Sequence, residues 1–528
     1  MSDTMPQDQQ DQQDQQHQQD RQKLESFDPA TGDVVGVHAV DDAASVEAAV
    51  ARARASAAWW AGIGFDARAE VLGQWRAVLT RRMAQLADVV HAETGKPHAD
   101  AQLEIGLAID HLAWIGAKAE KVLGRHRVSP GLLLANHSAS VEYLPLGVVG
   151  VIGPWNYPVF TPMGSIAYAL GAGNTVVFKP SELTPGVGVW LADSLREVVP
   201  GQHLLQTVIG WGETGTALCR ADIDKLAFTG STATGKKVMA TCAENLTPVV
   251  IEAGGKDALI VDEDADLDAA AEAAAWGAFS NAGQTCIGVE RVYVHEKVAD
   301  DFIGRLSERA RAVHAGVDAE AKLGPMTMSS QLEVVRSHVD DAIARGGRAV
   351  VGGPESVDDR FAQPVVLVDV PEDSLAVTEE TFGPTVVVNR VGCMDEAVEK
   401  ANAGKYGLGG AVFSGRRGAE IARQLRSGMT SVNAVIAFAA VPSLPFGGVG
   451  DSGFGRIHGA DGLKEFTYAK AVTRQRMKPV LNLTTFERTE EQDTLFATML
   501  TALHGRASQI GKRPLRERVA AVREKRRG

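Results

Sequence analysis

Residues 143–178, YLPLGVVGVIGPWNYPVFTPMGSIAYALGAGNTVVF, contain no Asp, Glu, Lys, Arg or His. A helix that crosses a bilayer needs about 20 consecutive apolar residues, with its backbone hydrogen bonds satisfied internally. Ten glycines and prolines interrupt every window of that length. The run therefore predicts the buried interior of a folded domain, and we expect no transmembrane segment.

The same glycines and prolines divide the run into a strand, a helix and a second strand. VVGVI is typical of a short buried strand, TPMGSIAYALGAG of a helix with Pro near its start and Gly at its end, and NTVVFKP of another strand. Strands and helices keep alternating as far as the segment TPVVIEAGG. This alternation predicts a doubly wound parallel sheet, whose ligand binds beyond the carboxyl ends of the strands.

Length, charge and cysteine content narrow the function. A chain of 528 residues predicts two or three domains. The formal charge of -13 argues against nucleic acid as a partner, because phosphate contacts need an excess of Lys and Arg. The four cysteines lack CxxC or Cys/His spacing, so we expect no metal site. We expect these thiols to be reduced and the protein to be cytoplasmic.

Both ends of the chain differ from the rest in composition. Residues 1–24 are mostly Gln and Asp, without the features of a secretory signal, and are expected to form a disordered arm. Residues 486–528 form a basic extension, with nine Lys or Arg against two Glu after residue 505. Two interpretations stay open for it: a solvated helix on the subunit surface, or peripheral contact with a membrane or an acidic partner.

The segment GSTATGKK, residues 230–237, resembles a phosphate-binding loop of nucleotide hydrolases. That loop needs Ser or Thr after its lysine to bind Mg²⁺, and this chain has Lys237 there. The hydrolase interpretation is therefore disfavoured. The backbone N–H groups of a helix start, with Ser231 beside them, would still suit an anionic phosphate group.

Cys286 follows the small, polar segment NAGQT, and by default a lone cysteine is a buried apolar residue. Its surroundings favour a different role. Residues 25–485 resemble the aldehyde dehydrogenase superfamily, with seven motifs in the family's order: GPWNYP, FKPSELTP, FTGS, EAGGK, NAGQTC, EETFGP and PFGGVGDSGFGR. The resemblance implies NAD(P)-dependent oxidation of an aldehyde to its carboxylic acid.

The resemblance also implies roles for three catalytic residues. Cys286 resembles the nucleophile, which adds to the aldehyde carbonyl and later carries a thioester. Asn156 resembles the side-chain donor that stabilises the oxyanion, together with the backbone N–H of Cys286. Glu252 resembles the general base that activates water to hydrolyse the thioester.

Cofactor contacts follow from other motifs of the same family. Lys179, Ser181 and Glu182 resemble the group around the adenosine ribose. A carboxylate at Glu182 favours NAD, because it accepts hydrogen bonds from a 2′-hydroxyl and repels a 2′-phosphate, but NADP stays open. The remaining predicted cofactor contacts are Trp155, Gly230, Ser231, Glu380 and Phe382.

The implied fold class is α/β, with three parts. A doubly wound, Rossmann-like cofactor domain is expected over residues 25–130 and 147–253, and an α/β catalytic domain over 254–468. A small oligomerisation flap is expected over 131–146 and 469–485, which implies a homodimer or homotetramer. Within the cofactor domain, residues 41–60 and 68–96 are expected to be helices.

Departures from the family's usual sequence bear on the substrate. Gly164 and Ser165 stand where related tetrameric enzymes carry Trp and Lys, which predicts a wider and less aromatic substrate tunnel. Arg291 is expected to face away from Cys286, so no arginine is expected to bind a carboxylated substrate. We therefore expect medium or bulky apolar and aromatic aldehydes. Acyl transfer to coenzyme A, or an inactive protein of the same fold, are the alternatives.

Overall fold

The structure is a computed structural model that describes residues 22–479 and 481–505. Its contacts divide the chain into two compact units. The main body comprises the described residues up to Arg125 and Glu142–Lys470. The smaller unit comprises His126–Val141 and the described residues from Ala471 onward. Most of the predicted arm, residues 1–21, lies outside the described residues.

A six-stranded sheet in the main body contains the charge-free run. Its strand order is β17-β9-β8-β5-β6-β7, parallel except for β17. Every residue of β6 is buried, and β5 is buried except at its last residue, as expected for strands covered on both faces. The bounds are β5 Val148–Ile152, β6 Thr175–Lys179, β7 Leu205–Thr207, β8 Lys225–Gly230, β9 Val249–Ala253 and β17 Gly453–Phe454.

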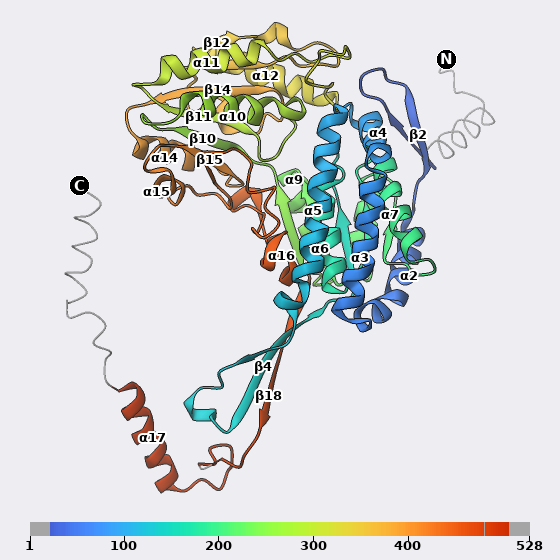
Figure 1. Ribbon diagram of the computed structural model, residues 1–528, viewed down its shortest axis with the longest axis vertical. Helices are drawn as coiled ribbons and strands as arrows, with labels where there is room; N and C mark the ends of the chain where they lie inside the picture. The colour runs from blue at the N-terminus through green and yellow to red at the C-terminus, as the bar shows by residue number, and fades with distance from the viewer. Residues whose placement is uncertain (1–21, 480, 506–528) are drawn as a thin grey trace, which may run out of the picture. The chain divides into compact units, whose positions relative to one another are not determined.

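Helices cover this sheet, and Figure 1 shows α3, α5 and α6 among them. Asp42 caps α2 by accepting a hydrogen bond from the backbone N–H of Ser45 at 2.8 Å. Gly173 ends α6 in the left-handed conformation, with φ of 101°. The helices are α2 Ala43–Gly62, α3 Gly64–Arg81, α4 Met83–Thr94, α5 His98–Leu123, α6 Phe160–Ala172, α7 Pro185–Val198, α8 Gly212–Arg220, α9 Thr232–Ala243 and α16 Gly459–Glu465.

The predicted helix over residues 68–96 is divided in the structure. Helix α3 ends at Arg81 and α4 begins at Met83, because Arg82 has a non-helical backbone, with φ of −110° and ψ of 20°. The guanidinium of Arg82 donates two hydrogen bonds to Glu197, at 2.9 and 2.8 Å. The second helix then ends at Gly95, which adopts the left-handed conformation. A continuous helical pattern did not predict this break.

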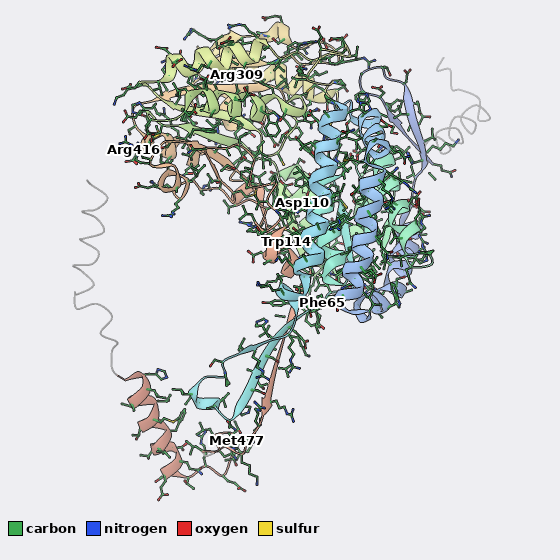
Figure 2. The ribbon with its side chains drawn as sticks, in the orientation of Figure 1. Phe65, Asp110, Trp114, Arg309, Arg416 and Met477 are labelled. Atoms are coloured by element: carbon green, nitrogen blue, oxygen red, sulfur yellow. The ribbon has the colours of Figure 1, made fainter. Side chains whose placement is uncertain are left out.

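A second, seven-stranded sheet has the order β12-β13-β14-β11-β10-β15-β16, parallel except between β12 and β13. Its strands are β10 Asp257–Val261, β11 Val289–His295, β12 Arg348–Val351, β13 Val365–Val368, β14 Thr385–Val391, β15 Gly410–Phe413 and β16 Ser431–Val432. Its helices are α10 Leu267–Phe279, α11 Ala299–Arg311, α12 Ser330–Ala344, α13 Leu375–Thr378, α14 Met394–Asn402 and α15 Gly418–Ala422. Arg416, whose side chain is 82% exposed, lies at the periphery of this region (Figure 2).

Shorter elements complete the main body. Strand β1 (Lys23–Phe27) pairs antiparallel with β2 (Val34–Ala39). Lys23 and Leu24, which were expected in the disordered arm, therefore lie in a strand, and burial of the Leu24 side chain fixes it there. Three short 3₁₀ helices are η2 Ser280–Gly283, η3 Pro354–Ser356 and η4 Gly450–Ser452.

The smaller unit contains most of a three-stranded sheet of order β18-β4-β3. Its strands are β3 His126–Val128, β4 His137–Pro145 and β18 Thr467–Gln475, with a 3₁₀ turn, η1, at Leu132–Leu134. Helix α17, Glu490–His504, begins with a capping box formed by Thr489 and Gln492 and has no buried residue. The basic residues after 505 lie outside the described part of the chain.

Within residues 22–479 and 481–505, no helix is both long enough and apolar enough to cross a membrane. The charge-free run instead forms β5, α6 and β6 of the main body. Most of its apolar side chains are part of the largest buried cluster of the described residues, while Val148 and Val177 belong to a second cluster.

Candidate active site

The carboxyl ends of the parallel strands in the six-stranded sheet meet at one edge. Strands β6 and β7 lie on one side of β5, and β8 and β9 on the other, so the winding reverses between β5 and β8. Open α/β sheets bind ligands at such a switch point. The loop after β5 carries Trp155 and Asn156, and β8 leads into Gly230 and Ser231. Residues of two separate predicted motifs therefore converge here.

A hollow of about 850 Å³, measured with its open mouth, lies at this edge and is called the edge hollow. Residues from the regions of both sheets line it, and those from the region of α12 are Met328, Gln331 and Val334. Eight of the sequence-predicted residues line it: Trp155, Asn156, Gly230, Ser231, Glu252, Cys286, Glu380 and Phe382.

The three other predicted cofactor residues do not line the edge hollow but lie at the same sheet edge. Lys179 is the last residue of β6 and pairs in register with Ile152 of β5. Its buried ammonium donates to the carbonyl of Pro180 at 3.1 Å and lies 3.8 Å from the Glu182 carboxylate. Ser181 accepts a hydrogen bond from the backbone N–H of Leu183 at 3.2 Å. Burial lowers the pKa of Lys179.

Cys286 is held at the end of an irregular segment between α10 and β11. Asn281 and Ala282 both adopt left-handed backbone conformations in η2, with φ of 55° and 54°. Residues other than glycine that are held in such strained backbone conformations are found mostly at functional sites. The segment leaves the Cys286 side chain half-buried, lining the edge hollow and a second hollow described below.

Glu252 is a buried carboxyl at the penultimate position of β9, with 3% of its surface exposed. Neither of its oxygens makes a hydrogen bond of normal length in the described part of the chain. Burial raises the pKa of Glu252 to about 8, although the nearby Cys286 thiol and Thr229 hydroxyl each act to lower it. Burial and the nearby carboxyls of Glu252 and Glu380 also raise the pKa of the Cys286 thiol. A buried carboxyl without a hydrogen bond of normal length is suited to receive a proton from a bound molecule.

Glu380 and Phe382 form another wall of the edge hollow. Glu380 accepts a hydrogen bond from the backbone N–H of Gly255 at 3.0 Å, and burial raises its pKa to about 8. The Phe382 ring meets the ring of Trp155 edge to face, with centroids 5.6 Å apart. Phe382 has a left-handed backbone, with φ of 53°. The aromatic pair thus joins a loop from each of the two sheets.

Asn156 is buried, and its amide nitrogen donates to the carbonyl of Gln284 at 2.8 Å. A side-chain amide carries two N–H groups, so this contact leaves one available. Its backbone carbonyl accepts hydrogen bonds from Lys96 at 2.8 Å and from Asn281 at 3.1 Å. These contacts fix the loop after β5 against the segment that leads to Cys286.

A buried ion pair between Lys96 and Glu104 supports this loop, and sequence reasoning missed it. Both side chains are fully buried, and their charged ends are in direct contact. Glu104 also accepts hydrogen bonds from the backbone N–H groups of Val159 at 2.7 Å and Phe160 at 3.0 Å. The sequence does show a Lys just before an apolar helix and a Glu in its second turn. A Lys and a Glu at such positions are usually interpreted as exposed to solvent.

A second buried pair, Lys256 with Glu290, supports the loop of Glu380 and Phe382 in the same way. Lys256 also donates to the hydroxyl of Thr381 at 3.1 Å. Glu290 accepts hydrogen bonds from the backbone N–H groups of Thr381 at 2.9 Å and Phe382 at 3.1 Å. Each of these two loops at the edge hollow is thus held by a buried carboxylate that binds two successive backbone N–H groups.

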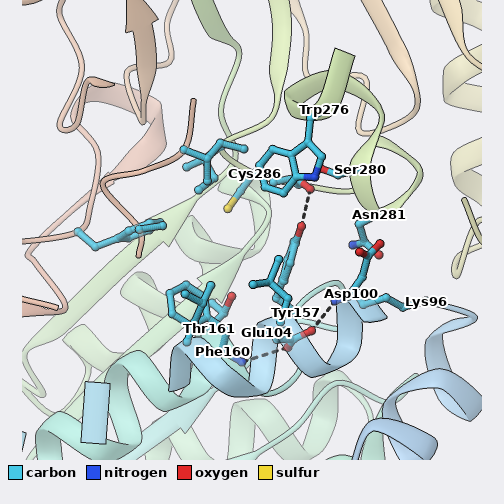
Figure 3. Close-up of a pocket in the computed structure, with 17 residues that line it drawn as sticks. Lys96, Asp100, Glu104, Tyr157, Phe160, Thr161, Trp276, Ser280, Asn281 and Cys286 are labelled. Carbon is cyan, nitrogen blue, oxygen red and sulfur yellow. Dashed lines mark hydrogen bonds and ion pairs between the residues drawn. The ribbon is translucent and has the colours of Figure 1, made fainter. Parts of the chain in front are cut away.

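The second hollow, called the apolar hollow, measures about 690 Å³ with its mouth and also reaches Cys286 (Figure 3). Tyr157 is one of the residues drawn in Figure 3, and its hydroxyl is hydrogen-bonded to the hydroxyl of Thr285 at 3.0 Å. Cys286 and Thr161 line both hollows. A molecule in the apolar hollow could therefore place one end at Cys286, where it would face a molecule in the edge hollow.

Gly164 and Ser165 are not among the residues that line the apolar hollow, and the expectation that they widen the tunnel stays a prediction. Both are buried in α6. A Cβ at Gly164 would lie 2.5 Å from Nε2 of His458, so the glycine makes room for that ring. Arg291 lies away from both hollows, as expected, and donates to the backbone carbonyl of Lys256 at 2.6 Å.

The doubly wound sheet, with a cysteine and two raised-pKa carboxyls at its switch point, has the features of an α/β oxidoreductase. The sequence model described as the aldehyde dehydrogenase family matches residues 16–472. The chain therefore belongs to the aldehyde dehydrogenase family and is an oxidoreductase that acts on aldehydes.

Named relatives and solved structures agree with this family. A Mycolicibacterium smegmatis protein with the provisional name succinate-semialdehyde dehydrogenase (NADP+) is 39% identical, over 86% of this chain and 88% of its own. A 4,4'-diapolycopene aldehyde oxidase of Methylomonas is 36% identical, over 84% of each chain. The NAD-dependent aldehyde dehydrogenase from Sinorhizobium meliloti matches with a TM-score of 0.83 and 33% identity, over 88% of this chain and 93% of its own.

Proposed function

We propose that this protein oxidises an aldehyde to its carboxylic acid with NAD(P)+, through a thioester on Cys286. One observation supports this most strongly. Cys286 lines both hollows and lies beside the buried carboxyl of Glu252, which makes no hydrogen bond of normal length among the residues that the structure describes. This arrangement offers a nucleophile, a base and separate spaces for two reactants.

The edge hollow fits a dinucleotide. It combines the turn of Gly230 and Ser231 at the start of α9 with the aromatic pair Trp155 and Phe382. We expect the helix start to hold the pyrophosphate and Glu380 the nicotinamide ribose. Lys179, Ser181 and Glu182 would hold the adenosine ribose, and Glu182 favours NAD over NADP. When bound, the dinucleotide supplies the hydride acceptor.

The Cys286 thiol first gives its proton to water, and the thiolate Sγ then forms a bond to the carbonyl carbon of the aldehyde. The carbonyl electron pair moves to the oxygen, and the second N–H of Asn156 and the backbone N–H of Cys286 stabilise this oxyanion. Loss of a hydride from the tetrahedral carbon re-forms the carbonyl and leaves a thioester on Cys286.

The second step hydrolyses that thioester. Glu252 takes a proton from water while the water oxygen bonds to the thioester carbon. The carbon–sulfur bond then breaks, the Cys286 thiolate leaves, and the acid is released. In the sum, an aldehyde, water and NAD(P)+ give a carboxylic acid, NAD(P)H and a proton.

The test is to follow NAD(P)H absorbance with a panel of aldehydes, with and without coenzyme A. Turnover without coenzyme A, lost in Cys286→Ala, is the expected result. Turnover that requires coenzyme A would indicate acyl transfer instead. If no aldehyde is turned over, or if Cys286→Ala retains the full rate, the proposal is wrong.

We also infer a homodimer or homotetramer in a reducing, cytoplasmic setting. The three-stranded sheet has β3 and β18 at its edges, and edge strands can pair between subunits. Cys219, Cys242, Cys286 and Cys393 are all free thiols. Measuring the solution mass by light scattering tests the inference about assembly, and a monomer would contradict it.

A further inference from the structure

We propose that the apolar hollow selects uncharged aldehydes with an apolar chain or ring and rejects aldehydes that carry a carboxylate at the other end. This inference rests on the proposed function, because it concerns the substrate of the same site. The name of the Mycolicibacterium smegmatis relative refers to an aldehyde that carries a carboxylate. The inference therefore assigns this chain a different class of substrate.

The walls of the hollow are mainly apolar. Leu107 of α5, Phe160 of α6 and Trp276 of α10 line it, together with Ile287, Ile436 and Phe446. Such walls favour hydrocarbon chains and aromatic rings, since apolar surface removed from water contributes about 25 cal/mol per Å². They come from distant parts of the sequence, which the fold brings together around Cys286.

The charged groups of the hollow cannot neutralise an incoming carboxylate. Lys96 is the only cation among its lining residues in the described part of the chain, and it is already paired with Glu104. It also donates to the carbonyl of Asn156. The third charged lining residue is Asp100, a half-buried carboxyl. An ω-carboxylate would therefore meet net negative charge.

Ser280 can form a hydrogen bond with an uncharged polar group of a substrate. Its buried hydroxyl has no hydrogen-bond partner in the described part of the chain. One hydroxyl can bind a hydroxyl or carbonyl group of a substrate, but it cannot offset the loss of water around a full negative charge. Polar, uncharged substituents are thus compatible with the site and carboxylates are not.

The test compares pairs of aldehydes that differ only by an isopropyl group in place of a carboxylate. The pairs are 4-methylpentanal with 4-oxobutanoate, and 4-isopropylbenzaldehyde with 4-carboxybenzaldehyde. We expect kcat/KM for the uncharged member to exceed that for the carboxylate by about 100-fold, because the carboxylate would be desolvated without a partner.

Two variants test the electrostatic cause. Leu107→Arg places a cation in the wall, and Asp100→Asn removes a negative charge. Each should move the ratio of the two kcat/KM values toward the carboxylate, by about 10-fold or more for the arginine. Leu132→Arg is the matched control, because Leu132 is exposed in the smaller unit and should leave the ratio unchanged.

The outcomes separate the two proposals. A wild-type ratio near one, or in favour of the carboxylates, overturns the inference about substrate class and leaves the proposed function standing. A ratio that neither Leu107→Arg nor Asp100→Asn moves overturns the electrostatic argument. Absence of turnover with every member of both pairs overturns the proposed function, and this inference with it.

Discussion

At the scale of single residues, the Cys286 thiol and the two nearby carboxyls of Glu252 and Glu380 dominate the chemistry. Burial raises the pKa values of Glu252 and Glu380 to about 8 and that of the Cys286 thiol above its usual range. Each group is thus neutral over more of the pH range than in water. A base must be ionised to accept a proton, so the proposed hydrolysis depends on pH through Glu252.

We predict that hydrolysis of the thioester on Cys286 speeds up as pH rises and levels off above about pH 8. The raised pKa leaves only a small fraction of Glu252 ionised at pH 6.5, and that fraction grows about tenfold per pH unit below the pKa. Single-turnover experiments that measure acid release after hydride transfer would check this. Glu252→Gln should remove this pH dependence. A wild-type profile that is flat from pH 6 to 9 would contradict the base role.

At the scale of elements, two buried Lys–Glu pairs hold two of the loops that carry the site. Lys96 and Glu104 hold the loop of Asn156, and Lys256 and Glu290 hold the loop of Glu380. Removing one partner of a buried pair leaves an uncompensated charge and typically costs about 3–5 kcal/mol. These pairs therefore couple the stability of the fold to the position of the catalytic groups.

We predict that Lys96→Met lowers the free energy of unfolding by about 3–5 kcal/mol, because Glu104 loses its charge partner. It should also lower kcat, since the carbonyl of Asn156 loses its hydrogen bond from Lys96. Denaturant unfolding and steady-state kinetics would measure both effects. The control is Arg82→Met, which breaks the exposed pair with Glu197 and should cost far less. Equal losses in the two variants would contradict this account.

At the scale of the whole molecule, the sequence predicts the five parallel strands of the six-stranded sheet but not its antiparallel edge strand β17. The glycines and prolines that exclude a membrane span also lie at the ends of β5 and α6 and just before the start of β6. Asn156, Glu252 and Cys286 could be identified because motifs at strand ends and in the segment before β11 carry them. The structure brings all three to one hollow, while their catalytic roles stay predictions.

Other features could not be predicted because they depend on contacts between distant segments. The break at Arg82 accompanies a pairing with Glu197, 115 positions further along the chain. The room that Gly164 leaves for His458 requires α6 and the segment before α16 to pack together. The walls of the apolar hollow combine α5, α6 and α10 with Ile436 and Phe446. Local periodicity contains no information about such pairings.

We predict that deleting residues 487–528 leaves the rate of aldehyde oxidation unchanged, because no described residue of this segment lines either hollow. The same variant tests the two interpretations of the basic extension. Loss of pelleting with anionic liposomes would favour membrane contact. A changed number of subunits per particle, obtained from the solution mass, would favour a role on the subunit surface. A large loss of kcat with an unchanged number of subunits would contradict the prediction.

The central claim is that a thioester forms on Cys286 and that Glu252 hydrolyses it. Rapid-mixing measurement of NADH formation by Glu252→Gln tests this most directly, with an aldehyde that the wild type oxidises. We predict a burst of NADH equal to the concentration of active sites, followed by turnover slowed by about 100-fold or more. A steady rate equal to that of the wild type, without a burst, would contradict the claim.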